Sequence, residues 1–225
     1  MKPSSSLIES FFEVVPAHLH GRSGKVFYSG RSAFERPAAL YIVGVNPGGH
    51  PDEHQQETIG SHSERVFHTL PANWSAYRSE SWEGHRPGTF GMAPQVLHML
   101  GQLGLPAEAV PSSNLVFVRS RSEADLAEEF DELANECWPF HHNVISKLRP
   151  RVILCLGTTA GRYVRNRLGA VTQIAEFQEI NRRKWTSRVH VTAEGIKVAT
   201  VTHPSRADWR NPAADPSALI KSAIS

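Results

Sequence analysis

Cysteine is scarce in this sequence of 225 residues, which contains only Cys137 and Cys155. We expect one thiol in a helix and the other in a strand. The pair therefore excludes a disulfide framework and a four-thiolate metal site, and it favours a reducing cytoplasm. Long apolar runs are missing as well. Within segment 1–21, Glu9 and Glu13 interrupt the apolar residues, which argues against a signal peptide or a membrane span.

Neither sign of charge dominates, because 24 Lys and Arg stand against 22 Asp and Glu, for a formal net charge of +2. Such a balance neither requires nor excludes a nucleic-acid partner. Acidic residues concentrate at 123–136, where the wet face of a helix explains them. Basic residues gather after Gly157, where a nucleic-acid-binding face and a solvated mixed surface are both open interpretations. They are Arg162, Arg165, Arg167, Arg182, Arg183, Lys184 and Arg188.

Several catalytic and ligand-binding motifs are absent from the sequence. It contains no Gly-x-Ser-x-Gly elbow, no Gly-Lys-Ser/Thr phosphate loop and no His-Glu-x-x-His pair. We therefore expect no metal and no cofactor. The histidines of two His-rich stretches lack metal-ligand spacing, and we expect them to be solvated. They are His50, His54, His62, His68, His141 and His142.

The pattern of apolar residues predicts alternating strands and helices. Apolar runs bounded by turn formers predict strands at 25–28, 39–45, 114–118, 152–156, 189–191 and 198–201. Helical spacing predicts helices at 6–19, 95–105, 126–148, 158–168 and 216–224, with a kink or break at Pro139.

This alternation predicts an α/β fold, a three-layer α/β/α sandwich with a central, mostly parallel sheet of four to five strands. We expect residues 1–225 to form a single domain, with an N-terminal helical extension over 1–24. The stretch 50–88 is polar and weakly patterned, and it is predicted to be a long functional or mobile loop.

Two short loops directly follow predicted strands, where ligands bind in such folds. The first is Gly44-Val45-Asn46-Pro47-Gly48-Gly49, and the second is His203-Pro204-Ser205. Glycines let a backbone approach a ligand closely, and a proline fixes a turn. A histidine at a strand end can donate to a ligand oxygen, and a serine can bind a phosphate. Each loop alone is equally consistent with a tight turn.

Together with the segments between them, these loops resemble the uracil-DNA glycosylase superfamily over residues 40–211. Segment 44–48 is similar to the first motif in its asparagine form, as in the mismatch-specific and single-strand-selective branches. Segment 203–205 is similar to the second motif. Between the two, 90–93 resembles the segment with a stacking phenylalanine and 114–116 the strand with a base-reading asparagine. Segment 152–157 resembles the strand-Leu-Gly turn.

The resemblance implies DNA with a deaminated base as substrate, a monomeric enzyme and base-excision chemistry. His203 would stabilise the departing base, and Asn46 would position the attacking water. The implied base-binding residues are Gly44, Val45, Phe90 and Asn114. The implied phosphate-binding residues are Pro47, Gly48, Gly49, Ser205 and Arg206.

The sequence departs from the family pattern at several positions. Val45 and Asn46 leave the first motif without a carboxylate, so we expect slow catalysis, or a base-binding module that does not turn over. Hydrolysis of a nucleoside or another small glycoside is a third interpretation. Phe67 is the fallback for the stacking Phe90. Arg206 and Trp209 are the candidates for a wedge inserted into a duplex.

Overall fold

The computed structural model describes residues 6–225, so the first five residues of the predicted 1–24 extension lie outside the described part. Six strands form one sheet in the order β2-β1-β3-β6-β5-β4. Strands β2, β1, β3 and β6 run parallel, whereas β5 and β4 are antiparallel additions. Their bounds are β1 Leu40–Gly44, β2 Ser112–Asn114, β3 Val152–Leu156, β4 Thr172–Gln178, β5 Thr186–Val191 and β6 Lys197–Val201.

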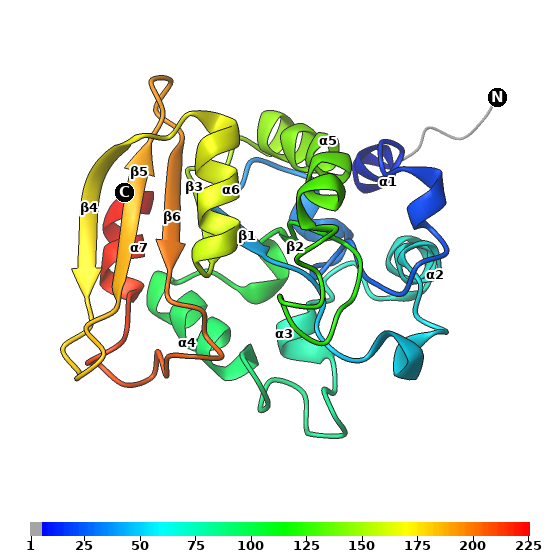
Figure 1. Cartoon of the computed structure of the whole chain (residues 1–225), viewed down its shortest axis with the longest axis horizontal. Coiled ribbons are helices and arrows are strands. Elements are labelled where there is room, and N and C mark those ends of the chain that lie inside the picture. The colour runs from blue at the N-terminus through cyan, green and yellow to red at the C-terminus, as the bar shows by residue number, and fades with distance from the viewer. Residues whose placement is uncertain (1–5) are drawn as a thin grey trace.

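Helices cover both faces of this sheet (Figure 1). Helix α6 contacts β3 and β6 on one face, and α7, packed against α4, contacts β3 and β4 from the other. The helices are α1 Leu7–Phe12, α2 Ile59–Glu64, α3 Ala76–Ser79, α4 Ala93–Leu103, α5 Phe130–Leu148, α6 Thr158–Leu168 and α7 Ser217–Ile224. This arrangement confirms the predicted α/β fold with a mostly parallel sheet.

The sheet has six strands, whereas four to five are predicted. Strand β4 is not predicted from the sequence, because it contains no apolar run. Most of its residues are exposed, and none is fully buried. By contrast, β1 and β3 are buried along their whole length, as continuous apolar runs in parallel strands predict. The predicted strand 25–28 makes only isolated antiparallel bridges, such as Phe27 to Ser113. Of the two alternatives expected at Pro139, a kink or a break, the break is wrong, because α5 continues through that residue.

Close packing of α6 on the sheet depends on a glycine. A Cβ atom on Gly161 would lie 2.1 Å from Oγ1 of Thr200, so a larger residue there would push the helix away from β6. The helix begins directly after Gly157, whose φ of 95° turns the chain sharply at the end of β3. Both glycines therefore fix the position of the N-terminus of α6 beside the end of β6.

Segment 50–88 is not the unpatterned loop that its polarity predicts. Besides α2 and α3, it contains a short 3₁₀ helix at Pro51–His54 and a short π-helix at Arg65–Thr69. Outside this segment, short 3₁₀ helices lie at Ala17–Leu19, Arg31–Phe34 and Ala107–Ala109. Ile59, Val66 and Trp74 anchor the segment in the core. None of the helices in the described range 6–225 has the length and apolarity to cross a membrane.

The expectation of solvated histidines is wrong for two of the six. His62 and His141 are 0% and 1% exposed. His62 packs against the Trp74 ring, and His141 shares a 2.8 Å hydrogen bond with the hydroxyl of Tyr41. Burial lowers the pKa of both imidazoles, so each is a neutral part of the core.

Candidate functional site

Four neighbouring parallel strands end at one edge of the sheet, the lower edge in Figure 1. At this edge lie Asn114, the last residue of β2, Asn46 after β1, Gly157 after β3 and His203 after β6. Only β3 separates β1 from β6, so the two strands that carry Asn46 and His203 lie about 10 Å apart. The topology therefore brings the two loops to the same end of the sheet, on either side of the turn at Gly157.

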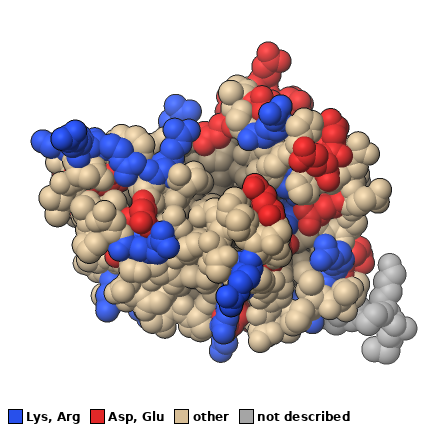
Figure 2. Space-filling model, turned by 90° about the horizontal axis from the view of Figure 1, so that it is seen from below, with Lys and Arg blue, Asp and Glu red and all other residues tan. Residues whose placement is uncertain are grey.

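Figure 2 views the molecule from the side of this edge and shows a separation of charge. Lys and Arg side chains gather at the upper left, over the end of the sheet that carries β4 and β5. Asp and Glu side chains gather at the upper right. An anionic ligand at the edge is therefore favoured on the side of the His203 loop.

The His203 side chain is held in one tautomer by Ser205. The backbone N–H of Ser205 donates to Nδ1 of His203 at 3.2 Å, and the Ser205 hydroxyl lies 2.7 Å from the same atom. Because a backbone N–H can only donate, Nδ1 carries no proton, and the neutral ring has its proton on Nε2. Burial lowers the pKa of His203; Glu123 opposes that shift and Arg206 adds to it. The site therefore contains a neutral imidazole with an Nε2–H donor.

The carboxamide of Asn46 is fixed by its nitrogen. Nδ2 lies 2.8 Å from Oγ of Ser120, 3.0 Å from the Pro47 carbonyl oxygen and 3.3 Å from that of Val118. Oδ1 has no partner among residues 6–225. An amide oxygen in this position can accept a hydrogen bond from a water molecule, but it cannot take its proton.

Asn114 lies against Gly44, and the two positions constrain each other. A Cβ atom on Gly44 would be 2.1 Å from Oδ1 of Asn114, so only glycine fits beneath this carboxamide. Asn114 is 4% exposed, and within the described chain its Nδ2 makes no hydrogen bond of normal geometry, although the side chain lies near the buried Tyr28 hydroxyl, whose pKa it lowers against the larger effect of burial. An unpaired buried donor costs about 1–3 kcal/mol, which a ligand with an acceptor atom would recover.

The rest of the first loop is held by contacts with side chains of neighbouring segments. Gly48 and Gly49 are exposed, while Pro47 and Val45 are buried. Arg119 donates to the Gly48 carbonyl oxygen. Gly49 has a φ of 104°, and a Cβ atom there would come within 3.0 Å of the His54 ring. The loop therefore presents backbone at the surface and has its shape set by side chains behind it.

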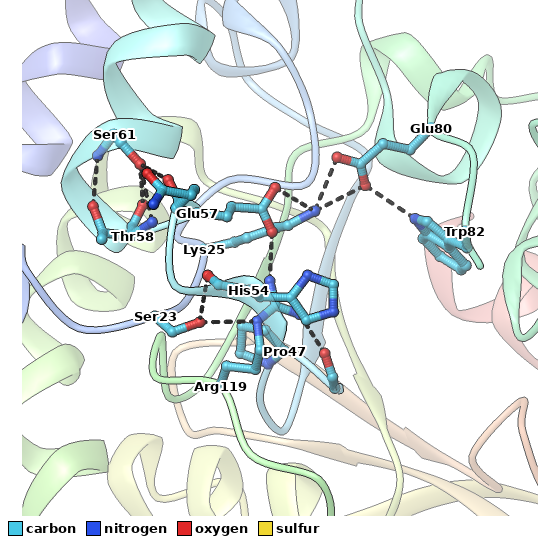
Figure 3. Close-up of polar contacts among 12 residues, drawn as sticks. Ser23, Lys25, Pro47, His54, Glu57, Thr58, Ser61, Glu80, Trp82 and Arg119 are labelled. Atoms are coloured by element: carbon cyan, nitrogen blue, oxygen red, sulfur yellow. Dashed lines mark hydrogen bonds and ion pairs between the residues drawn. The ribbon is translucent and has the colours of Figure 1, made fainter. Parts of the chain in front are cut away.

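Arg119 belongs to a partly buried ionic cluster beside the first loop, drawn in Figure 3. Its guanidinium lies 2.5 Å from Glu57, and Nζ of Lys25 lies 3.3 Å from Glu57 and 2.9 Å from Glu80. Donor atoms of Glu57, His62 and Glu80 lie within 4.8 Å of one another, a spacing that suits a metal ion. The Lys25 ammonium already lies between the two carboxylates and compensates their charge, whereas neither ring nitrogen of His62 has a hydrogen-bond partner within residues 6–225.

Sequence patterns did not point to this cluster. Lys25, Glu57, Glu80 and Arg119 come from four separate segments, and none lies in a recognisable motif. One signal was present in the sequence, namely Arg119 directly after the predicted strand 114–118. Its partner in segment 57–80 could not be identified without the fold.

The aromatic candidates occupy different environments. Phe90 is half-buried, and its ring stacks on His85 with centroids 4.1 Å apart. Phe67 packs in the core between Phe12 and Phe27, so it cannot serve as the fallback stacking residue. Trp209 is 0% exposed and donates to the Thr202 carbonyl oxygen at 3.2 Å, which excludes it as a wedge.

Arg206 is exposed beside His203, so of the two wedge candidates it is the one at the surface. Its carbonyl oxygen accepts a hydrogen bond from Arg183, which links the second loop to the connection between β4 and β5. The structure thus brings Asn46, Asn114 and His203 to one edge, with the glycine loop and Arg206 beside them.

The comparison with family models agrees with this arrangement. The model of the Uracil DNA glycosylase superfamily matches residues 32–223, from before β1 to the last turn of α7. No curated protein matches the chain significantly. Since the match covers most of the chain and contains every strand of the sheet, the chain belongs to the uracil DNA glycosylase superfamily.

Proposed function

We propose that the chain is a monofunctional DNA glycosylase that hydrolyses the N-glycosidic bond of uracil or another deaminated base. The observation that carries this proposal is the unpaired, buried amide nitrogen of Asn114 at the carboxyl end of β2. The proposal assigns the protein to the branches whose first motif contains asparagine, here Asn46. It treats residues 1–225 as one domain that acts as a monomer without a cofactor.

Base selection follows from the chemistry of the Asn114 amide. Its Nδ2 donates to O4 of uracil, which satisfies the unpaired donor. Cytosine has an amino group at the same place, so two donors would meet and no hydrogen bond would form. The requirement for glycine at position 44 supports this role, because it keeps the carboxamide in place.

Bond cleavage sends the electron pair of the C–N bond onto the departing base. The neutral His203 donates its Nε2–H to O2 of the base and stabilises the developing anion. Asn46 holds the water that attacks the sugar through its free Oδ1, and the released proton passes to solvent. Val45 and Asn46 provide no base, so we expect a rate about 10²–10⁴-fold below that of an enzyme with one.

The glycine loop and the second loop hold the strand on either side of the extruded nucleotide. Exposed Gly48 and Gly49 present backbone to a phosphate, with Pro47 shaping the turn, and Arg206 adds a charge. The Ser205 hydroxyl, 2.7 Å from Nδ1 of His203, can turn to a phosphate while the backbone N–H of Ser205 keeps its contact with the ring. Phe90 stacks on the base after separating from His85, or by its opposite ring face.

The test is a glycosylase assay on uracil, hypoxanthine and xanthine, each in single-stranded and in mismatched duplex DNA. We expect abasic sites with at least one of these bases. His203→Gln should lower the rate by at least tenfold, whereas His142→Gln, an exposed histidine on α5, should leave it unchanged. Intact DNA with every base at high enzyme concentration would exclude the glycosylase.

A base-binding module of the same fold is the second candidate. It is favoured by the non-ionisable Val45 and by Asn46, whose amide nitrogen is already engaged by three oxygens. Saturable binding of uracil-containing oligonucleotides without cleavage, abolished in Asn114→Leu, would support this module. Cleavage would exclude it.

A further inference from the structure

A pocket of about 360 Å³ lies beside the His203 loop, between α6 and the strands β5 and β6. Three arginines line it: Arg162 and Arg165 from α6, and Arg188 from β5. They belong to the basic group after Gly157 that the glycosylase proposal does not use. The pocket also contains His190, and Thr158 and Thr159 at the N-terminus of α6.

Two hydrogen-bond donors in this pocket lack an acceptor. Arg165 Nη1 lies 2.9 Å from Nε2 of His190. An arginine can only donate, so Nε2 is the acceptor and the neutral His190 ring carries its proton on Nδ1. His190 is 7% exposed, and neither its Nδ1 nor Nε of Arg165 has a partner within residues 6–225. Both nitrogens therefore require a hydrogen-bond acceptor, and the arginines that line the pocket make its surroundings positively charged.

The charge of the pocket is poorly compensated by the protein. Across the described chain, Arg162 and Arg165 form no ion pair, and Arg188 lies 3.6 Å from Glu176, with both side chains about half exposed. Glu123 accepts a hydrogen bond from Thr159 Oγ1 at the rim. The first N–H groups of α6 add the positive end of a helix of 11 residues. Such an arrangement favours an oxyanion.

We propose that this pocket binds a phosphate group. Thr158 follows Gly157, and a Cβ atom on Gly157 would lie 3.6 Å from Cβ of His203, so the pocket borders the candidate site. If the proposed function holds, the ligand is a backbone phosphate of the strand near the extruded nucleotide. The alternative source of the same chemistry is free phosphate or a phosphomonoester.

The experiment uses the full chain and the double variant Arg162→Gln/Arg188→Gln, whose side chains are both exposed and whose replacement spares the core. Arg36→Gln is the control, because Arg36 is exposed just before β1, at the opposite edge of the sheet. Inorganic phosphate is titrated by NMR, and a uracil-free single-stranded oligonucleotide is titrated at several salt concentrations. We expect at least tenfold weaker phosphate binding in the double variant and no change in the control.

For the oligonucleotide, removing one ion pair with a phosphate should reduce the slope of log K against log salt by about 0.7. A reduced slope identifies a backbone phosphate, and weaker binding of inorganic phosphate alone identifies a free one. Unchanged phosphate affinity together with an unchanged slope overturns the proposal.

Arg165→Lys, which keeps the charge but removes the fixed guanidinium contact to His190, is a second variant and should also bind phosphate more weakly. Neither titration requires base excision, so failure of the glycosylase assay would not affect them.

Discussion

The backbone N–H of Ser205 donates to Nδ1 of His203 across 3.2 Å, and the hydroxyl of the same serine lies 2.7 Å from that atom. Two contacts from one residue thus fix the ring orientation and leave Nε2–H as the only donor of the neutral ring. Ser205→Ala retains the backbone contact and removes the hydroxyl. We expect about a fivefold loss of the excision rate, equivalent to one neutral hydrogen bond of about 1 kcal/mol. Single-turnover kinetics measure the rate, and an ¹⁵N spectrum of the imidazole should show the same Nε2–H tautomer. A change of tautomer would contradict this account.

Gly44 and Gly48 provide a matched pair of positions in the first loop. Gly44→Ala places a methyl group 2.1 Å from Oδ1 of Asn114, whereas a Cβ atom on Gly48 meets open space. We expect Gly44→Ala to lower stability by about 1–3 kcal/mol and to abolish base binding, because the carboxamide must move. Gly48→Ala should unfold at the same urea concentration as the parent protein. Equal behaviour of the two variants would show that the carboxamide is not held at Gly44.

Asn114 should be a residue that costs stability. Replacing it by leucine, which is similar in size, removes the unpaired buried amide donor. We expect Asn114→Leu to be at least as stable as the parent protein in urea unfolding, and by up to about 1–3 kcal/mol more stable. Binding of uracil-containing oligonucleotides should fall at the same time. A strongly destabilised variant would indicate that the amide has a partner in the folded protein.

Lys25 should be essential to the ionic cluster beside the first loop. Lys25→Met leaves Glu57 and Glu80 without the ammonium between them, and we expect a loss of about 3 kcal/mol in the free energy of unfolding. The comparison is Arg78→Gln, which breaks a more exposed pair with Glu108 and should cost at most about 1 kcal/mol. Similar losses in the two variants would contradict a special role for Lys25.

His141 should make stability depend on pH. Burial lowers its pKa from 6.5 to about 4, so the unfolded chain binds this proton more readily than the folded one. The free energy of unfolding that depends on neutral His141 is fully present above pH 6.5. It falls by about 3 kcal/mol as the pH drops toward 4. Burial of His62 acts in the same direction. Urea unfolding at pH 7.5 and 4.5 should show a smaller difference in His141→Gln, and an unchanged one in the exposed His142→Gln.

Composition and periodicity predict the parts of the fold that are buried on both sides. The runs at 39–45 and 152–156 are apolar throughout because their strands lie in the centre of a parallel sheet, and their predicted bounds agree with the structure within one or two residues. Strand β4 has one face toward solvent and lies at the edge, so its sequence has no apolar run. The helices of segment 50–88 are short, and single residues such as Ile59 anchor them, which leaves no periodic pattern.

In the candidate site, the positions of the main residues are predictable from the sequence, whereas the contacts that orient their side chains are not. Asn46, Asn114 and His203 each lie at or near the end of a strand, so the topology of a parallel sheet is enough to bring them to one edge. The partners that orient them are set by contacts distant in the chain. The hydrogen bond from Asn46 to Ser120 joins residues 74 positions apart, so no local sequence pattern predicts it.

The interval between the Asn46 and His203 loops is spanned by β3, which pairs with β1 on one side and β6 on the other. The spacing of the strands from which the two loops emerge is therefore set by the hydrogen-bonded sheet. A preorganised frame of this kind requires little reorganisation of the protein when a ligand enters. If the proposed function holds, the conformational change falls on the substrate, because the nucleotide must leave its own stack to reach loops whose anchoring strands are already in place.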